Sequence, residues 1–312
     1  MGEERSYKEL FRESLKSTDT EEWLDIHFNR PIGFCITLIG QRLNIHPNTI
    51  TLISIVLGIL AAIMFYCHDL LHNLLGVLFL MMANFCDSAD GQLARITGKK
   101  TLLGRALDGF AGDVWFFCIY ASLCLRMMPQ QMPFTDMPWG YSIWVLAFVA
   151  GILCHTRQAS LGDYYRQIHL FFLFNKGNDE LNRSQQLFDT YRQQPRKEWL
   201  ARAFYLFYGR YCRSQERRTP AFQQFFETYL RYAEYNDTKA VREMFLTGSR
   251  PLMKYTNILT FNVRAICLYI TCLADQPWIY FVFEILILLP LYLYMRAKHE
   301  QLCVRCTARM NG

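Results

Sequence analysis

The sequence predicts an all-α, polytopic membrane protein with six transmembrane helices, an N-terminal interfacial helix and a helical cytoplasmic insertion. Of the 312 residues, 52% are hydrophobic and 15% are aromatic, and the hydrophobic residues are gathered in blocks. Several blocks are shorter than the about 20 apolar residues that a full crossing needs. We therefore expect the second and third helices to continue past the hydrocarbon. The predicted spans are residues 49–67, 71–86, 107–127, 140–154, 256–274 and 278–295.

The chain is expected to have four segments. Residues 1–48 form a cytoplasmic N-terminal segment, and within it residues 30–43 are apolar with scattered polar residues, which favours an interfacial helix over a short soluble one. Residues 49–159 hold transmembrane helices 1–4, and residues 256–312 hold helices 5–6 and a cytoplasmic tail. Between them, residues 160–255 form the helical insertion.

Positive charge predicts the orientation. Lysine and arginine gather between the second and third spans and after the last span, whereas the loops at the other ends of the spans carry almost none. Because cytoplasmic loops carry an excess of these residues, we expect both termini and the loop after the second span to be cytoplasmic. The charged positions are Arg95, Lys99, Lys100 and Arg105, and then Arg296, Lys298, Arg305 and Arg309.

The predicted insertion is basic and rich in aromatic residues. It carries 16 Lys and Arg against 10 Asp and Glu, a charge that suits anionic lipid headgroups. Basic residues among aromatics are also found in RNA-binding proteins, but a tether beside a bilayer favours lipid, so no nucleic-acid partner is expected. Pro195 and Pro220 predict the starts of helices, and Gly177 and Gly248 predict the ends of others.

A polar motif follows the second span. Asp87 and Asp90 are three residues apart and share one face of a helix, and Asp108 follows at the start of the third span. Like charges that close disfavour each other unless a cation neutralises them. Oxygen ligands of this kind suit Mg²⁺ or Mn²⁺, which also bind substrate phosphates. The motif therefore predicts a divalent-cation site.

The spacing Asp87-x2-Asp90-Gly91-x2-Ala94-Arg95-x8-Gly104-x3-Asp108 resembles that of the CDP-alcohol phosphotransferases, also called CDP-alcohol phosphatidyltransferases. The resemblance extends loosely over residues 29–159, through Asn29-Arg30-Pro31, residues 46–51 and Arg157. It implies an integral membrane enzyme of phospholipid synthesis with six crossings, a cation cofactor and a possible homodimer.

One position departs from the pattern. The family pattern places a last aspartate at position 112, where this chain has Gly112 followed by Asp113. An ideal helix turns about 100° per residue, so Asp113 would lie about 140° around from Asp108. A π-type bulge would bring the two onto one face, and Gly109 and Gly112 would ease it. We expect Asp113 to be the fourth carboxylate. The alternative is an altered or weakened site.

The resemblance assigns roles to the remaining motif residues. The predicted metal ligands are Asp87, Asp90, Asp108 and Asp113, with Asp113 and Asp108 as the catalytic residues and Asp113 as the proton acceptor. The residues expected to bind the nucleotide are Gly91, Ala94, Arg95, Gly104, Asn48 and Thr51. Close helix packing is the alternative for the small residues, and helix capping for Asn48 and Thr51. The candidates for the acceptor or lipid phosphate are Arg105, Arg157 and Arg264.

The predicted activity is transfer of a phosphatidyl or phospho-alcohol group from CDP-diacylglycerol or another CDP-alcohol to an alcohol, with release of CMP. The Asn29-Arg30-Pro31 run favours inositol or inositol phosphate as the acceptor. Transfer of a CDP-linked headgroup to a lipid hydroxyl is the alternative within the family. Two alternatives from other classes are a membrane cation transporter and an inactive scaffold, the second favoured only by Gly112.

Overall fold

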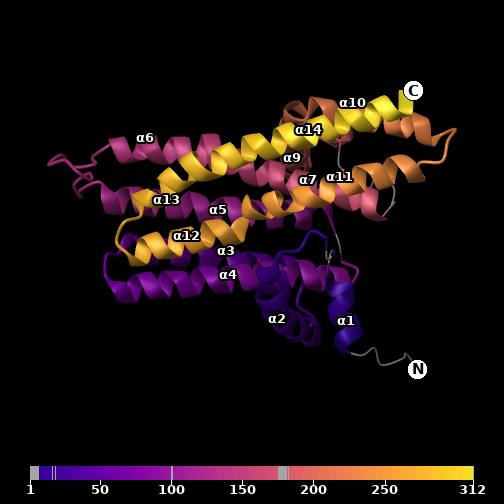
Figure 1. Ribbon diagram of the computed structural model, residues 1–312. Coiled ribbons are helices and arrows are strands. Elements are labelled where there is room, and N and C mark those ends of the chain that lie inside the picture. The colour runs from indigo at the N-terminus through magenta and orange to yellow at the C-terminus, as the bar shows by residue number, and fades with distance from the viewer. Residues whose placement is uncertain are drawn as a thin grey trace. The chain divides into compact units, whose positions relative to one another are not determined.

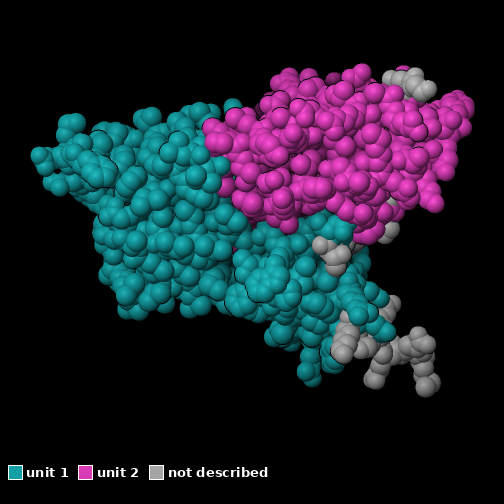
Figure 2. Space-filling view, in the orientation of Figure 1, with its two compact units in different colours: residues 1–157, 262–287 teal, residues 158–261, 288–312 magenta. Residues whose placement is uncertain are grey.

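The computed structural model describes residues 7–15, 17, 19–99, 101–174, 181 and 183–311 (Figure 1). These residues form helices, turns and one isolated β-bridge between Gln131 and Pro138, with no strand among them. The all-α prediction is confirmed. The chain divides into two compact units, coloured separately in Figure 2. Unit 1 comprises residues 1–157 and 262–287, and unit 2 comprises residues 158–261 and 288–312.

Six helices in the described part of the chain are long and apolar enough to cross a membrane. They are Pro47–Tyr66, Leu70–Ile96, Ala106–Met127, Ser142–Phe174, Lys239–Leu273 and Trp278–Met310. Each overlaps one predicted span, which confirms the polytopic membrane fold. The last three have 33, 35 and 33 residues. At 1.5 Å per residue that is about 50 Å, against about 30 Å of hydrocarbon. These three helices are longer than the spans predicted within them, because each helix continues into a polar segment.

The first part of unit 1 comprises α1 (Tyr7–Ser14), the π-helical η1 (Asp25–Asn29), α2 (Arg30–Arg42), α3 (Pro47–Tyr66), α4 (Leu70–Ile96) and α5 (Leu102–Met127). A side chain caps the start of each of the last three helices. His46 accepts a hydrogen bond from the Asn48 amide, Asp69 from the His72 amide and Thr101 from the Gly104 amide. Each bond satisfies an amide that the helix leaves unpaired at its N-terminus.

Helix α3 packs along both α4 and α5, as Figure 1 shows. Small residues allow the close approach. A Cβ on Gly58 of α3 would overlap the ring of Trp115 of α5, and a Cβ on Gly76 of α4 would overlap Phe65 of α3. Membrane helices commonly use such contacts, because close packing rather than hydrophobic burial holds them together. The three helices thereby form one packed group.

The remaining elements of unit 1 enclose a buried polar network. They are α6 (Ser142–Phe148), the π-helical η2 (Val149–His155), the start of α7 (Thr156–Phe174), nearly all of α12 (Phe261–Leu273), α13 (Trp278–Phe283) and most of the π-helical η3 (Glu284–Leu288). Arg264 Nη1 donates to the two carboxylate oxygens of Glu284 at 2.6 and 2.5 Å. Tyr280 Oη donates to the same carboxylate at 2.8 Å, and His155 Nδ1 lies 3.2 Å from it.

Unit 2 is built on an aromatic core. Its helices are the rest of α7, α8 (Ser184–Gln193), α9 (Trp199–Arg218), α10 (Pro220–Ala233), α11 (Lys239–Ile258) and α14 (Leu289–Asn311). The ring of Phe172 contacts those of Phe225, Tyr229 and Phe245, and His299 stacks on Tyr165. The described residues of the predicted insertion are therefore mainly helical. Its cytoplasmic placement stays a prediction.

Four helix boundaries are predicted in unit 2, and one of them, Gly177, lies outside the described residues. The helix start predicted at Pro195 is wrong, because α9 begins at Trp199. Helix α10 begins at Pro220, as predicted. Gly248, however, lies inside α11, so the helix end predicted there is wrong. A Cβ on Gly248 would overlap the side chain of Leu302 in α14. The glycine therefore serves close packing of two helices instead of ending one.

Removing one member of the buried pair should destabilise the protein. Glu284→Leu leaves the buried Arg264 without its carboxylate, and we expect a loss of about 3–5 kcal/mol of stability. The double variant Arg264→Met with Glu284→Leu should recover part of that loss, because it removes both charges. Thermal unfolding in detergent measures both, with Glu227→Leu on the exposed face of α10 as the control. A wild-type midpoint for the single variant would contradict the expectation.

Candidate active site

The α4–α5 hairpin brings the predicted carboxylates together. Asp87 and Asp90 lie in the second half of α4, and Asp108 lies in the second turn of α5. Gly98, between the two helices, has φ +69°, a left-handed conformation that glycine adopts without strain. Each of the three side chains offers a carboxylate oxygen, and these oxygens all lie within 4.8 Å of one another. We call these three residues the aspartate group.

The surroundings of the aspartate group suit a cation. Asp90 is buried, and Thr51 Oγ1 of α3 donates to its Oδ2 at 2.5 Å. No arginine, lysine or histidine with a described side chain forms an ion pair with the group. Three carboxylates this close repel one another in a partly buried site. A divalent cation would offset that repulsion, and oxygen donors are the ligands that Mg²⁺ and Mn²⁺ prefer. The donor set therefore fits the predicted cofactor.

Asp113 lies apart from the aspartate group. Helix α5 is α-helical without interruption from Leu102 to Met127, so the predicted π-type bulge is wrong. Asp113 is therefore about 140° around the helix from Asp108 and about 7.5 Å further along it. Its side chain is exposed, and the structure brings only the other three carboxylates together.

Position 112 lies one helical turn beyond Asp108, close to the same face. A Cβ built on Gly112 would have no atom within 4 Å, so the fold leaves room there for a longer side chain. A Cβ built on Gly109 would likewise have no atom within 4 Å. Neither glycine is therefore needed to avoid a clash with a neighbouring element.

Two glycines of the motif lie beside polar side chains. A Cβ on Gly104 would come within 3.1 Å of Asn48 Oδ1 and 3.0 Å of Thr101 Oγ1. Glycine therefore lets the start of α5 approach the start of α3. A Cβ on Gly91 would lie 3.4 Å from Arg95 Nη1, so the guanidinium of Arg95 lies over this glycine. Ala94 is half-buried on the same helix. The role of these residues in nucleotide binding stays a prediction.

Arg95 has an unused hydrogen-bond donor. Its Nε donates to the carbonyl of Ser14, the last residue of α1, at 2.5 Å. Its Nη2 is buried and has no hydrogen-bond partner among the described residues. A buried donor without a partner is costly, and an anion such as a phosphate would satisfy it. This is the position at which the sequence predicts phosphate binding.

The N-terminal segment packs against the motif, which the sequence did not indicate. Gln92 Nε2 donates to Ser14 Oγ at 3.1 Å and to the Arg30 carbonyl at 3.2 Å. Arg30 Nη1 donates to Ser88 Oγ at 3.3 Å, and its Nε bonds to Glu21 at 2.8 Å. Arg30 thus reaches the residue next to Asp87. Only the Asn29-Arg30-Pro31 run could have pointed to this segment, and its spacing does not predict a contact with α4.

The three arginines predicted to bind the acceptor have different surroundings. Arg264 is buried and bonded to Glu284, so a substrate phosphate would have to compete with that carboxylate. Arg157 is exposed at the start of α7. The side chain of Arg105 lies outside the described part of the structure. All three assignments stay predictions.

Comparison with known proteins supports the family resemblance inferred from the motif. Residues 44–163, which contain α3, α4, α5 and the aspartate group, match the family model described as CDP-alcohol phosphatidyltransferase. Archaetidylinositol phosphate synthase of Pyrococcus horikoshii is 39% identical over 66 residues, which make up 21% of this chain and 34% of that protein. The chain therefore matches about a third of the length of this relative. The family model that matches residues 44–163 is that of the family the motif resembles, so the match confirms the resemblance over this part of the chain.

Proposed function

We propose that this chain is a metal-dependent CDP-alcohol phosphotransferase of phospholipid synthesis. It would move a phosphatidyl or phospho-alcohol group from a CDP-linked donor to an alcohol acceptor and release CMP. The observation that carries the proposal is the aspartate group, which the α4–α5 hairpin forms inside the segment that matches the family.

Different residues of the site have different roles in this phosphoryl transfer. The acceptor oxygen attacks a phosphorus of the donor pyrophosphate, the bond from that phosphorus to the bridging oxygen breaks, and CMP leaves with the electron pair. A bound Mg²⁺ or Mn²⁺ would neutralise the charge that develops on the pyrophosphate. Asp87, Asp90 and Asp108 would hold the cation, and Thr51 orients Asp90 through its hydrogen bond. The unpartnered Nη2 of Arg95 donates to a phosphate oxygen.

The acceptor proton needs a base, and we assign this role to Asp113. A general base must reach the hydroxyl it deprotonates, but it need not bind the cation. Asp113 is exposed and follows Asp108 on the same helix. Asp113 forms no hydrogen bond or ion pair with a described side chain, so its carboxylate is available to a substrate hydroxyl.

For the acceptor we propose inositol phosphate, with inositol as its unphosphorylated counterpart, and CDP-diacylglycerol or another CDP-alcohol as the donor. The Pyrococcus horikoshii relative is named as a synthase of archaetidylinositol phosphate, and this name supports inositol phosphate as the acceptor. Arg30 and Arg95 supply positive charge on the side of α4 that carries Ser88 and Gly91. We further propose that the site faces the cytoplasm, as the distribution of lysine and arginine predicts.

CMP release by the purified protein tests the proposal. Asp87→Asn and Asp108→Asn should each abolish acceptor-dependent CMP release, because each removes one carboxylate from the cation site. The assay uses CDP-diacylglycerol, Mg²⁺ or Mn²⁺, and a panel of inositol phosphate, inositol, glycerol phosphate, serine and choline. Asp136→Asn, in an exposed loop, is the matched control and should keep wild-type turnover. Normal turnover in either motif variant would reject the cation site.

Asp113→Asn tests the base separately from the cation site. We expect CMP release to fall by about 10²–10⁴-fold, the usual contribution of a general base, while Mn²⁺ affinity stays unchanged. Gly112→Asp added to this variant should restore part of the turnover, because position 112 lies near the face of Asp108 and has room for a side chain. If Asp113→Asn turns over like the wild type, the base is another residue.

Thr51→Val tests the hydrogen bond to Asp90. Valine keeps the shape of the side chain but cannot donate, and loss of a partner that orients a metal ligand typically lowers metal affinity about 10–100-fold. Isothermal titration with Mn²⁺ measures the change. Thr49→Val on the exposed side of the same helix is the control, and equal affinities for the two variants would contradict the assigned role of Thr51.

Gly112 favours one other function, an inactive relative that acts as a membrane scaffold. The glycine removes the carboxylate that the family pattern places next to Asp108. The same assay separates the two possibilities. A scaffold would release no CMP with any acceptor, and Gly112→Asp would be the variant most expected to gain turnover.

A further inference from the structure

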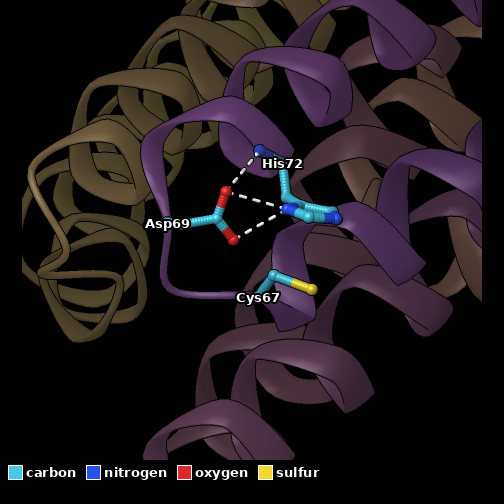
Figure 3. Close-up of side chains that lie close together, drawn as sticks. All are labelled: Cys67, Asp69 and His72. Carbon is cyan, nitrogen blue, oxygen red and sulfur yellow. Dashed lines mark hydrogen bonds and ion pairs between the residues drawn. The ribbon is translucent and has the colours of Figure 1, made fainter.

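A second cluster of metal-ligand side chains lies at the opposite end of α4. Cys67 is the residue after α3, Asp69 is the residue before α4, and His72 lies in the first turn of α4. Each offers one ligand atom, and these atoms all lie within 4.8 Å of one another. Figure 3 shows the Asp69 carboxylate facing the His72 ring, with the Cys67 side chain beside them. We call these residues the Cys67 cluster.

A buried hydrogen-bond network fixes the backbone of this turn. Asn73 Nδ2 donates to the carbonyls of Cys67 at 3.1 Å and Asp69 at 2.8 Å. Arg126 Nη1 donates to Asn73 Oδ1 at 2.8 Å and to the Phe65 carbonyl at 2.9 Å. Asn73 and Arg126 are both 1% exposed. The cluster is therefore held by groups that cannot move without breaking buried hydrogen bonds, which is the support that a metal site needs.

The ligand side chains themselves are open to solvent. The side chains of Asp69 and His72 are 55% and 43% exposed. His72 Nδ1 lies 2.8 and 2.7 Å from the two oxygens of Asp69. Next to the cluster, His68 Nδ1 lies 3.3 Å from Asp275, which also pairs with Arg126.

We propose that Cys67, Asp69 and His72 bind Zn²⁺. A thiolate, an imidazole and a carboxylate are the three donor types that zinc takes in proteins. A softer ion such as Cu⁺ prefers sulfur ligands alone, and a harder ion such as Mg²⁺ prefers oxygen ligands alone. Three protein ligands leave the fourth position of a tetrahedral ion to water. The Cys67 thiol loses its proton when the ion binds.

Helix capping alone explains only part of this arrangement. As the residue before α4, Asp69 accepts a hydrogen bond from the His72 amide at 3.1 Å, and this also brings the His72 side chain near. Capping does not require a thiol within 4.8 Å of both groups. The position of Cys67 is therefore the observation that distinguishes a metal site from a cap.

The proposed zinc site is separate from the aspartate group. His72 and Asp90 are eighteen residues apart on one continuous helix, which puts them about 27 Å apart at 1.5 Å per residue. That distance is close to the about 30 Å thickness of membrane hydrocarbon, so the two sites lie toward opposite faces of the bilayer. The zinc ion would bind from the compartment opposite the aspartate group, and it can neither exchange directly with the catalytic cation nor share a ligand with it.

Cobalt titration of the purified full chain tests the proposal. Co²⁺ bound to a thiolate gives a near-ultraviolet charge-transfer absorption, whereas Co²⁺ bound only to carboxylates, as at the aspartate group, does not. We expect this absorption to saturate in the wild type and to disappear when Zn²⁺ is added. Cys67→Ser should abolish it, and His72→Ala should lower Co²⁺ affinity at least tenfold. Asp69 is left unchanged because it also caps α4.

Two cysteine variants serve as controls. Cys35→Ser removes an exposed thiol of α2 that belongs to none of the groups of three or more metal-ligand side chains among the described residues. Cys303→Ser removes the thiol of the other cysteine-containing group, formed with His299 and Glu300 in unit 2. Both controls should keep the full absorption.

Two results would overturn the proposal: no thiolate absorption in the wild type, or an absorption that survives in Cys67→Ser. A second readout covers the case in which Cys67→Ser does not fold. Zn²⁺ should raise the unfolding temperature of the wild type and of Cys35→Ser but not that of His72→Ala, because an ion that binds only the folded state stabilises it. An equal shift in all three proteins would also reject the site.

Discussion

The repulsion among Asp87, Asp90 and Asp108 is the constraint on which the motif end of unit 1 depends. Their carboxylate oxygens lie within 4.8 Å of one another, an arrangement that no hydrophobic packing favours by itself. Thr51 offsets part of the cost, since a hydrogen bond to a charged group contributes about 1.5–3 kcal/mol. The dipole of α4 contributes little, because Asp90 lies more than one turn before the helix end at Ile96. The divalent cation that we propose for this site would offset the remaining repulsion.

The sequence predicts those parts of the fold that depend on residues close together in the chain. Asp87 and Asp90 share a helix face because they are three residues apart, and the apolar blocks locate all six long helices. Sequence spacing does not predict the structure where one residue type is compatible with two local structures. Gly248 could end a helix or admit Leu302, and only the structure shows the second. The bulge expected between Asp108 and Asp113 assumed that a fourth carboxylate must join the other three, and a regular helix shows that it does not.

Charge within a membrane span does not by itself identify a ligand site. Arg126 and Arg264 are both buried, and each bonds to an acid, Asp275 and Glu284 respectively. Arginine at such depth must be paired, and here the pairing joins elements far apart in the chain. Arg95 differs, because one of its nitrogens is buried without a partner among the described residues. An unsatisfied donor beside the aspartate group is a stronger sign of a phosphate site than a positive charge is.

Helix α12 links the two ends of unit 1 through polar contacts that no sequence pattern could reveal. At its start, Asn262 donates to Glu22 and Asp25 and accepts from Asn29, which immediately precedes Arg30 and its bond to Ser88. Beyond its end, Asp275 accepts from Arg126, which holds the turn of the Cys67 cluster. Between them, Arg264 bonds to Glu284. These contacts join residues up to 240 positions apart. The same helix therefore supports the segment over the aspartate motif and the turn at the far end of α4, although it contributes no ligand to either proposed site.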